Sequence, residues 1–140
     1  IISGYNDVDY IIEYNQLVVY KGRERWPNPS DPGYAGVYDL SLHKEIIKPE
    51  KYHEMEIIDY NLFLVSDDIE NSLYGTLINE KEEIIGKEKY WDQVCHTFRK
   101  NSKYNYQASS MDKKYYVFNI ENNTIVDLLE ISRDDFFKKY

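Results

Sequence analysis

The sequence IIDYNLFLV (residues 57–65) repeats, with conservative changes, the sequence IIEYNQLVV found 46 residues earlier (residues 11–19). The dipeptide Tyr-Asn of these two segments recurs at residues 104–105, 44 residues beyond the second of them. A second match joins IIKPEKY (residues 46–52) to IIGKEKY (residues 84–90), with five of seven positions identical at a spacing of 38. Two independent matches in the same order indicate an internal repeat of about 40 to 45 residues.

The implied repeat consists of short apolar strands separated by polar turns, with one strand opened by Tyr-Asn. Apolar runs of four to six residues between turn signals are typical of a chain of β-hairpins. Residues 60–65 and 115–118 are apolar on both faces, which predicts central strands covered on both sides. We expect strands near residues 10–20, 35–40, 44–47, 55–66, 73–79, 82–86, 94–99, 104–110, 114–120 and 124–129.

These features predict an all-β fold, mainly antiparallel hairpins from about three repeats, in a single domain over residues 1–140. The expected repeat units are residues 10–33, 34–72, 73–113 and 114–131, followed by a C-terminal helix at residues 132–140. Ser132 would be the N-cap of this helix, with acids in the first turn and lysines in the last. Residues 26–33 contain three of the four prolines and predict an irregular loop, because proline cannot donate within a β-ladder.

Composition restricts the class of protein. The chain has 140 residues, with 25 acidic against 17 basic residues and a net charge of −8. No apolar run approaches the roughly 20 residues that a membrane-spanning helix needs, so we expect no membrane association. The negative charge disfavours nucleic acid as a partner, since phosphate binding needs a basic surface. A lone cysteine, Cys95, cannot form an internal disulfide, which favours a reducing compartment and the cytoplasm.

Residues 74–85, followed by Tyr90, resemble the WG-repeat (KWG) unit of bacterial proteins. In that unit an aromatic-Gly pair opens a short strand, a polar turn follows, and a second strand with paired Ile or Val leads to a downstream Tyr. Residues 36–47 followed by Tyr52 are similar, with one more residue in the turn. A third copy, residues 116–126, lacks the glycine.

The resemblance covers about residues 34–130, and Tyr74 or Ala35 stands where the family has its tryptophan. It implies stacked β-hairpins that act as interaction modules. Such units also occur among small immunity proteins of bacterial toxin systems.

Two groups of residues are candidates for a catalytic or metal site. Asp92, Cys95 and His96 could form a thiol nucleophile with its base. Adjacent residues of a strand point to opposite faces, however, which favours a structural cysteine beside an exposed histidine. His43, His53 and Glu54 could bind a metal, but their spacing does not converge as metal ligands require, so we expect no metal site.

The acid pairs 67–68 and 82–83 could serve a hydrolase with two carboxylates, but both fall in expected turns, where acids are normally solvated. The sequence has no glycine-rich phosphate loop, serine elbow or nucleotide-binding fingerprint. We therefore expect no enzyme activity, no cofactor and no small-molecule substrate. An active site assembled from scattered acids and tyrosines is the least favoured alternative.

The strongest functional signal is a gap in positive charge. From Tyr52 to Glu80 the chain has no Lys or Arg, and aromatic residues alternate with acids there. Such a stretch suits docking to a basic protein, with charge guiding the encounter and aromatics providing affinity; the alternative is a merely solvated acidic face. The predicted partner-binding acids are Glu54, Glu56, Asp59, Asp67, Asp68, Glu70 and Glu80. Trp26, in the proline-rich loop, is a further candidate contact, or else it covers the edge of a hairpin.

The sequence thus favours an acidic inhibitor or immunity factor. Such a protein would neutralise a cationic bacterial effector, for example a nuclease toxin, by direct protein–protein binding. Two alternatives remain: a WG-type scaffold module of a larger assembly, and a phage-encoded inhibitor of a host nuclease.

Overall fold

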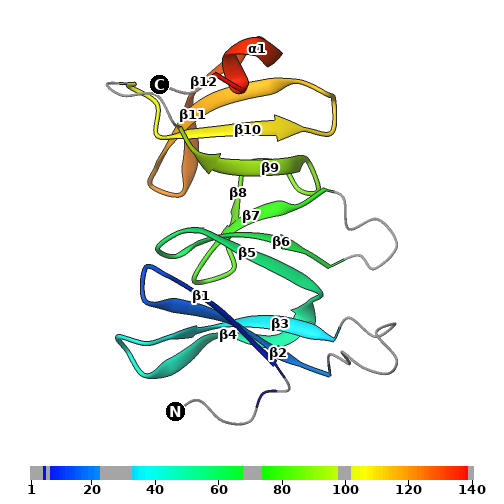
Figure 1. Cartoon of the computed structure of the whole chain (residues 1–140), viewed down its shortest axis with the longest axis vertical. Coiled ribbons are helices and arrows are strands. Elements are labelled where there is room, and N and C mark those ends of the chain that lie inside the picture. Colours follow the sequence, from blue (N-terminus) through cyan, green and yellow to red (C-terminus); the bar gives the residue numbers. More distant parts are fainter. Residues whose placement is uncertain (1–4, 6, 23–32, 68–73, 98–101, 139–140) are drawn as a thin grey trace.

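Three four-stranded antiparallel sheets make up the chain, stacked one on another along its long axis (Figure 1). The computed structural model describes residues 5, 7–22, 33–67, 74–97 and 102–138. The first sheet contains β1 (Asp7–Glu13), β2 (Gln16–Lys21), β3 (Tyr34–Asp39) and β4 (Lys44–Tyr52). The second contains β5 (Glu54–Asp59), β6 (Leu62–Ser66), β7 (Thr76–Asn79) and β8 (Ile84–Ile85). The third contains β9 (Trp91–His96), β10 (Tyr106–Ser110), β11 (Tyr115–Glu121) and β12 (Thr124–Ile131).

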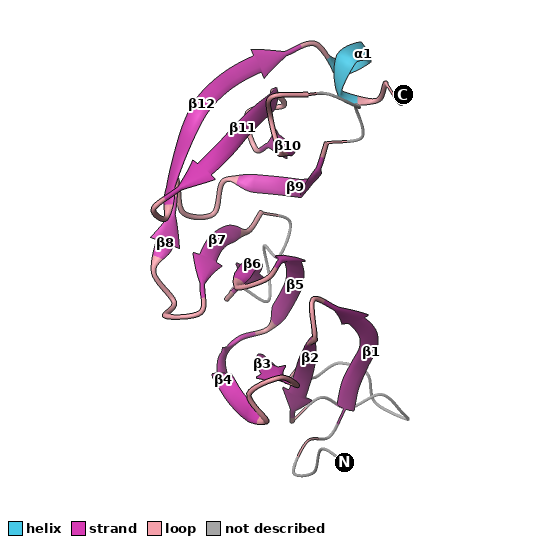
Figure 2. Cartoon of the chain, turned by 90° about the vertical axis from the view of Figure 1, so that its left-hand side faces the viewer, coloured by secondary structure: helices cyan, strands magenta, loops and turns pink. Residues whose placement is uncertain are grey.

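Within each sheet the strands follow one another in sequence order, so every sheet is a simple meander. Figure 2 shows the consequence: the first strands β1, β5 and β9 lie along one side of the stack, and the fourth strands β4, β8 and β12 along the other. The predicted all-β antiparallel fold with a short C-terminal helix is confirmed.

Three of the Tyr-Asn dipeptides lie directly before the second strand of a sheet, two of them in a tight turn. β2, β6 and β10 begin directly after residues 14–15, 60–61 and 104–105. Tyr14, Asn15 and Asn61 have φ angles of 55°, 60° and 58°, in the left-handed region that Asn tolerates better than most residues. The prediction of single strands over residues 10–20 and 55–66 was therefore wrong, because each stretch is a hairpin that reverses at Tyr-Asn.

The sheets divide the sequence at different points from the expected units. They run over residues 7–52, 54–85 and 91–131. The expected units 34–72 and 73–113 each combine the last two strands of one sheet with the first two of the next. The repeat period is visible in the sequence, but which strand comes first in each sheet depends on hydrogen bonding between the backbones of neighbouring strands.

The two central strands of the middle sheet, β6 and β7, are buried on both faces. All five residues of β6 are buried, as expected for a central strand. Phe63 and Val65 join a core shared with the first sheet, whereas Leu62 and Leu64 join a core shared with the third. β7 divides in the same way, with Ile78 in the former core and Leu77 in the latter.

The third sheet lies at one end of the stack, and its outer face is covered by the C-terminal helix α1 (Arg133–Phe136). The ring of Phe136 is buried 4.8 Å from that of Tyr115, and the Gln107 amide donates to the Phe136 carbonyl at 3.1 Å. Tyr115 and Tyr116 are only half-buried, so the expectation of a strand covered on both faces at residues 115–118 was wrong there. A four-residue helix covers less surface than a second sheet.

Ser132 is the N-cap of α1, as predicted, and its hydroxyl accepts the Asp135 backbone N–H at 3.1 Å. The helix ends at Phe136, well before the expected end at residue 140. Among the described residues, no helix has the length and apolar character needed to cross a membrane. Most of the proline-rich loop, residues 23–32, lies outside the described residues.

The glycines of the two aromatic-Gly motifs lie where backbones or side chains approach closely. A Cβ atom at Gly36 would meet the Ile47 carbonyl oxygen and lie 2.7 Å from the backbone nitrogen of Pro49 on β4. A Cβ atom at Gly75 would lie 2.9 Å from Leu64 Cδ1. Both positions therefore exclude larger side chains because of lack of space.

We expect Phe63→Ala to reduce the free energy of unfolding by about 3–5 kcal/mol, because it leaves a cavity at a fully buried position. Leu128→Ala, on the edge strand β12 and 54% exposed, should cost less than about 0.5 kcal/mol. Urea denaturation of both variants measures the difference. Equal losses of unfolding free energy in the two variants would show that β6 is not the centre of the core.

Candidate functional site

Acidic residues gather on the first strand of each sheet. β5 has the sequence EMEIID, with Glu54, Glu56 and Asp59, and β9 has WDQVCH, with Asp92. β1, with the sequence DVDYIIE, contains three further acids. None of these three strands contains Lys or Arg, a property that they share with β3, β11 and β12, whereas β4 contains three lysines. We call the three strands on this side of the stack the first-strand surface (Figure 2).

Glu54 and Glu56 lie on the exposed face of β5, because the strand alternates between exposed acids and the buried residues Met55 and Ile57. Together with the exposed Asp92 on β9, they line a cavity of about 150 Å³ between the second and third sheets. The side chains of Met55, Leu64 and Trp91 also line it. The arrangement presents three carboxylates beside an apolar floor.

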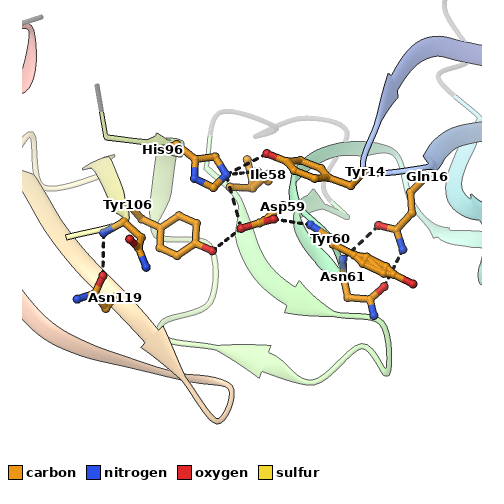
Figure 3. Close-up of polar contacts among 10 residues, drawn as sticks. Tyr14, Gln16, Ile58, Asp59, Tyr60, Asn61, His96, Tyr106 and Asn119 are labelled. Carbon is orange, nitrogen blue, oxygen red and sulfur yellow. Dashed lines mark hydrogen bonds and ion pairs between the residues drawn. The ribbon is translucent and has the colours of Figure 1, made fainter. Parts of the chain in front are cut away.

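Asp59, at the end of β5, joins the second sheet to the third (Figure 3). Its carboxylate accepts a hydrogen bond from the Tyr106 hydroxyl at 2.7 Å and one from the Tyr60 backbone N–H at 2.8 Å. Burial of the Tyr106 phenol, and its hydrogen bond to Asp59, raise the pKa of Tyr106 above its usual value. The phenol therefore stays protonated and remains a donor.

His96 extends this cluster to the first sheet. Its Nε2 atom lies 3.1 Å from the Ile58 carbonyl oxygen, 3.1 Å from the Tyr14 hydroxyl and 3.6 Å from Asp59 Oδ2. A carbonyl oxygen can only accept, so Nε2 carries a proton in this geometry. One turn of the first sheet, the end of β5 and the end of β9 thus meet at a single imidazole (Figure 3).

A second polar cluster fixes the first sheet against the β5–β6 turn. The amide of Gln16 donates to Asn61 Oδ1 at 2.7 Å and to Asp39 Oδ2 at 3.2 Å, and Gln16 Oε1 accepts the Asn61 backbone N–H at 3.1 Å. The Tyr60 hydroxyl donates to Asp39 Oδ2 at 3.1 Å, and the Leu42 N–H donates to Oδ1 at 2.9 Å. Gln16 and Asp39 are both buried, so this cluster stabilises the junction of two sheets.

The pKa of Asp39 is lowered despite its burial. Burial by itself raises the pKa of a carboxyl, and here it is the largest single influence. Hydrogen bonds from the Leu42 N–H, the Gln16 amide and the Tyr60 hydroxyl stabilise the carboxylate and together outweigh it. Asp39 is therefore a structural anion.

The remaining predicted partner-binding residues do not all join the first-strand surface. Asp67 lies 3.6 Å from Lys89 Nζ, beside a cavity of about 200 Å³ that Tyr52 and Glu82 also line. Glu80 is half-buried in the β7–β8 turn, close enough to Tyr60 to contribute to the raised pKa of that phenol. Asp68, Glu70 and Trp26 lie outside the described residues.

The candidate nucleophile and metal ligands are separated by the fold. Burial, and to a lesser degree the Glu56 carboxylate, raise the pKa of the Cys95 thiol, which disfavours the reactive thiolate. His53 Nδ1 lies 2.7 Å from the Gly33 carbonyl oxygen, and its ring stacks on Tyr34. Within the described ranges, no three His, Cys, Asp or Glu side chains are grouped so that they could hold a metal ion.

Sequence reasoning missed the grouping of Asp92, His96, Tyr14 and Tyr106 with the β5 acids. The available signal was the Asn of the repeated Tyr-Asn, because Asn tolerates a positive φ and so indicates a turn. A turn at Tyr-Asn separates β1 from β2 and β5 from β6. Without those turns, the first strands could not be recognised as a set that lacks positive charge.

Comparison with protein-family models, curated proteins and solved structures found no match to this chain. The resemblance to WG repeats therefore remains a prediction from the residues that carry it.

We expect Asp39→Asn to lower the free energy of unfolding at pH 7 by about 1–2 kcal/mol, because the buried anion loses charge-assisted hydrogen bonds. Folding lowers the pKa of this carboxyl, so its ionised form stabilises the folded protein at any pH above the pKa of the group in the unfolded chain. That stabilisation is lost as the pH falls through the pKa of the group in the folded protein. The difference between wild type and variant should therefore shrink below about pH 4. Urea denaturation between pH 3 and pH 7 measures it, with the exposed Glu121→Gln as control. A difference in unfolding free energy between wild type and variant that does not change with pH would contradict stabilisation by the Asp39 carboxylate.

Proposed function

We propose that this chain is an acidic protein inhibitor, of the immunity-factor kind, that binds a basic effector such as a nuclease toxin. The observation that carries the proposal is the first-strand surface, since β1, β5 and β9 lie along one side of the stack and contain acids but no Lys or Arg. The basic partner would dock along this side.

Charge of one sign spread over three neighbouring strands produces a field that a basic protein senses before contact. Such a field raises association rates and depends strongly on salt. Aromatic side chains near the acids provide the short-range part of binding, as tyrosines commonly do at interfaces. Tyr14 and Tyr60, each 44% exposed, occupy the turns next to Asp59 and His96 and fit this role.

A scaffold module of the WG type is the second candidate function. It is favoured by the stacking of three similar meanders, since repeat arrays commonly present an extended binding surface. A phage-encoded inhibitor of a host nuclease would use the same acidic surface as an immunity factor. The identity of the partner separates these possibilities.

Affinity capture from a lysate of the native source tests the function. At low salt we expect the chain to retain one basic enzyme, which is inactive while bound. At about 0.5 M salt, where screening shortens the reach of charge to a few ångströms, retention should drop sharply. Capture of a large complex that is indifferent to salt would support the scaffold function instead.

Charge reversal tests the surface. We expect Glu54→Lys combined with Glu56→Lys to slow association with the captured partner by about tenfold at low salt, because the steering field is weakened. Glu50→Lys combined with Glu121→Lys makes the same change of charge on β4 and β11, and should alter the rate by less than about twofold. Stopped-flow mixing measures both rates. Equal effects of the two double variants would indicate net charge alone and would contradict docking at β5.

A further inference from the structure

A cavity of about 700 Å³ lies at the end of the third sheet and shares Asp92 with the smaller cavity beside β5. Its lining comes from the start of β9, the β10–β11 turn, the end of β12 and the beginning of α1. A volume of this size is in the range of pockets that bind small molecules. The β11–β12 hairpin brings together residues that are 20 positions apart in sequence, Lys113 and Arg133.

Three cations and two carboxylates line this cavity, a small excess of positive charge in a chain whose net charge is −8. Lys113, Lys114 and Arg133 line it together with two carboxylates, those of Asp92 and Glu130. Lys114 Nζ lies 3.7 Å from Glu130 and is partly neutralised by it. Among the described residues neither Lys113 nor Arg133 has a carboxylate within ion-pair distance, and the Arg133 guanidinium lies 5.7 Å from the centre of the Phe137 ring. Both cations can therefore pair with an anion.

The other lining groups suit a ligand that carries hydroxyls. Ser109 and Ser110 are buried at the floor, and the Ser109 hydroxyl lies 3.4 Å from Asp92 Oδ2. Asp92 and Glu130 can accept hydrogen bonds from ligand hydroxyls. The phenol rings of Tyr74 and Tyr115 provide flat surfaces against which a sugar ring or carbon chain can pack.

We propose that this cavity binds a small phosphorylated sugar or polyol. Lys113 and Arg133 would hold the phosphate, because a dianion matches two unneutralised cations and the guanidinium presents paired donors to phosphate oxygens. The Asp92 and Glu130 carboxylates would accept hydrogen bonds from the hydroxyls. An extended polyanion is disfavoured by the net charge of −8. The expectation of no small-molecule ligand was drawn from the sequence, which does not reveal that Lys113 and Arg133 line one cavity.

Titration with three probes, followed by amide chemical shifts and calorimetry, tests the proposal. Glucose 6-phosphate supplies both charge and hydroxyls, inorganic phosphate only the charge, and glucose only the hydroxyls. We expect glucose 6-phosphate to bind at least about tenfold more tightly than either of the others, since a charge-assisted contact and the hydroxyl contacts add. The amides of Ser109, Ser110 and Tyr115 should shift in the wild-type protein.

Lys113→Gln combined with Arg133→Gln should weaken glucose 6-phosphate binding by about tenfold or more. The matched control, Lys44→Gln with Lys103→Gln, removes two exposed cations outside the cavity and should change affinity by less than about twofold. Equal weakening in both double variants, or shifts confined to residues outside the cavity, would overturn the site. Inorganic phosphate binding as tightly as glucose 6-phosphate would overturn the recognition of hydroxyls. Because shifts in the wild type locate the ligand directly, the test does not depend on the variants folding.

Discussion

Burial of the central strands β6 and β7 on both faces is the constraint on which the rest of the structure depends. β6 sends Phe63 and Val65 into one core and Leu62 and Leu64 into the other, so neither core forms without this strand. A sheet covered on both faces needs a continuous apolar run, which residues 62–65 supply. The first and third sheets need only one apolar face each toward this centre, and their outer faces tolerate polar residues or a short helix.

Polar contacts at the Tyr-Asn turns decide how the sheets are oriented on this apolar centre. Apolar packing has no strong directional preference, whereas the buried hydrogen bonds of Gln16 and Asp39 with the β5–β6 turn are satisfied in only one arrangement. Asp59, Tyr106 and His96 serve the same purpose between the second and third sheets. Both clusters lie beside the first-strand surface, so the contacts that orient the sheets also position its acids.

Charge is distributed by the meander topology. Because the strands of every sheet follow sequence order, the first strands of the three sheets lie along one side of the stack. The fourth strands lie along the other side. Glu54 and Glu56 of β5 therefore lie beside one cavity with Asp92 of β9, on the side of the stack where β1 also lies. The β11–β12 hairpin does the opposite at the end of the third sheet, where it joins Lys113 and Arg133 beside one cavity.

The sequence by itself determined the fold class, the repeat period, the covered strand at residues 62–65 and the Ser132 cap, because these depend on local patterns of apolar, turn and capping residues. It also showed the excess of acids near residues 54–59. Only the tertiary structure decided which strands share a sheet, that Asp59 is engaged by Tyr106 and His96, and that Asp92 joins Glu54 and Glu56. These groupings arise from pairing and stacking between segments tens of residues apart, for which a local pattern carries no information.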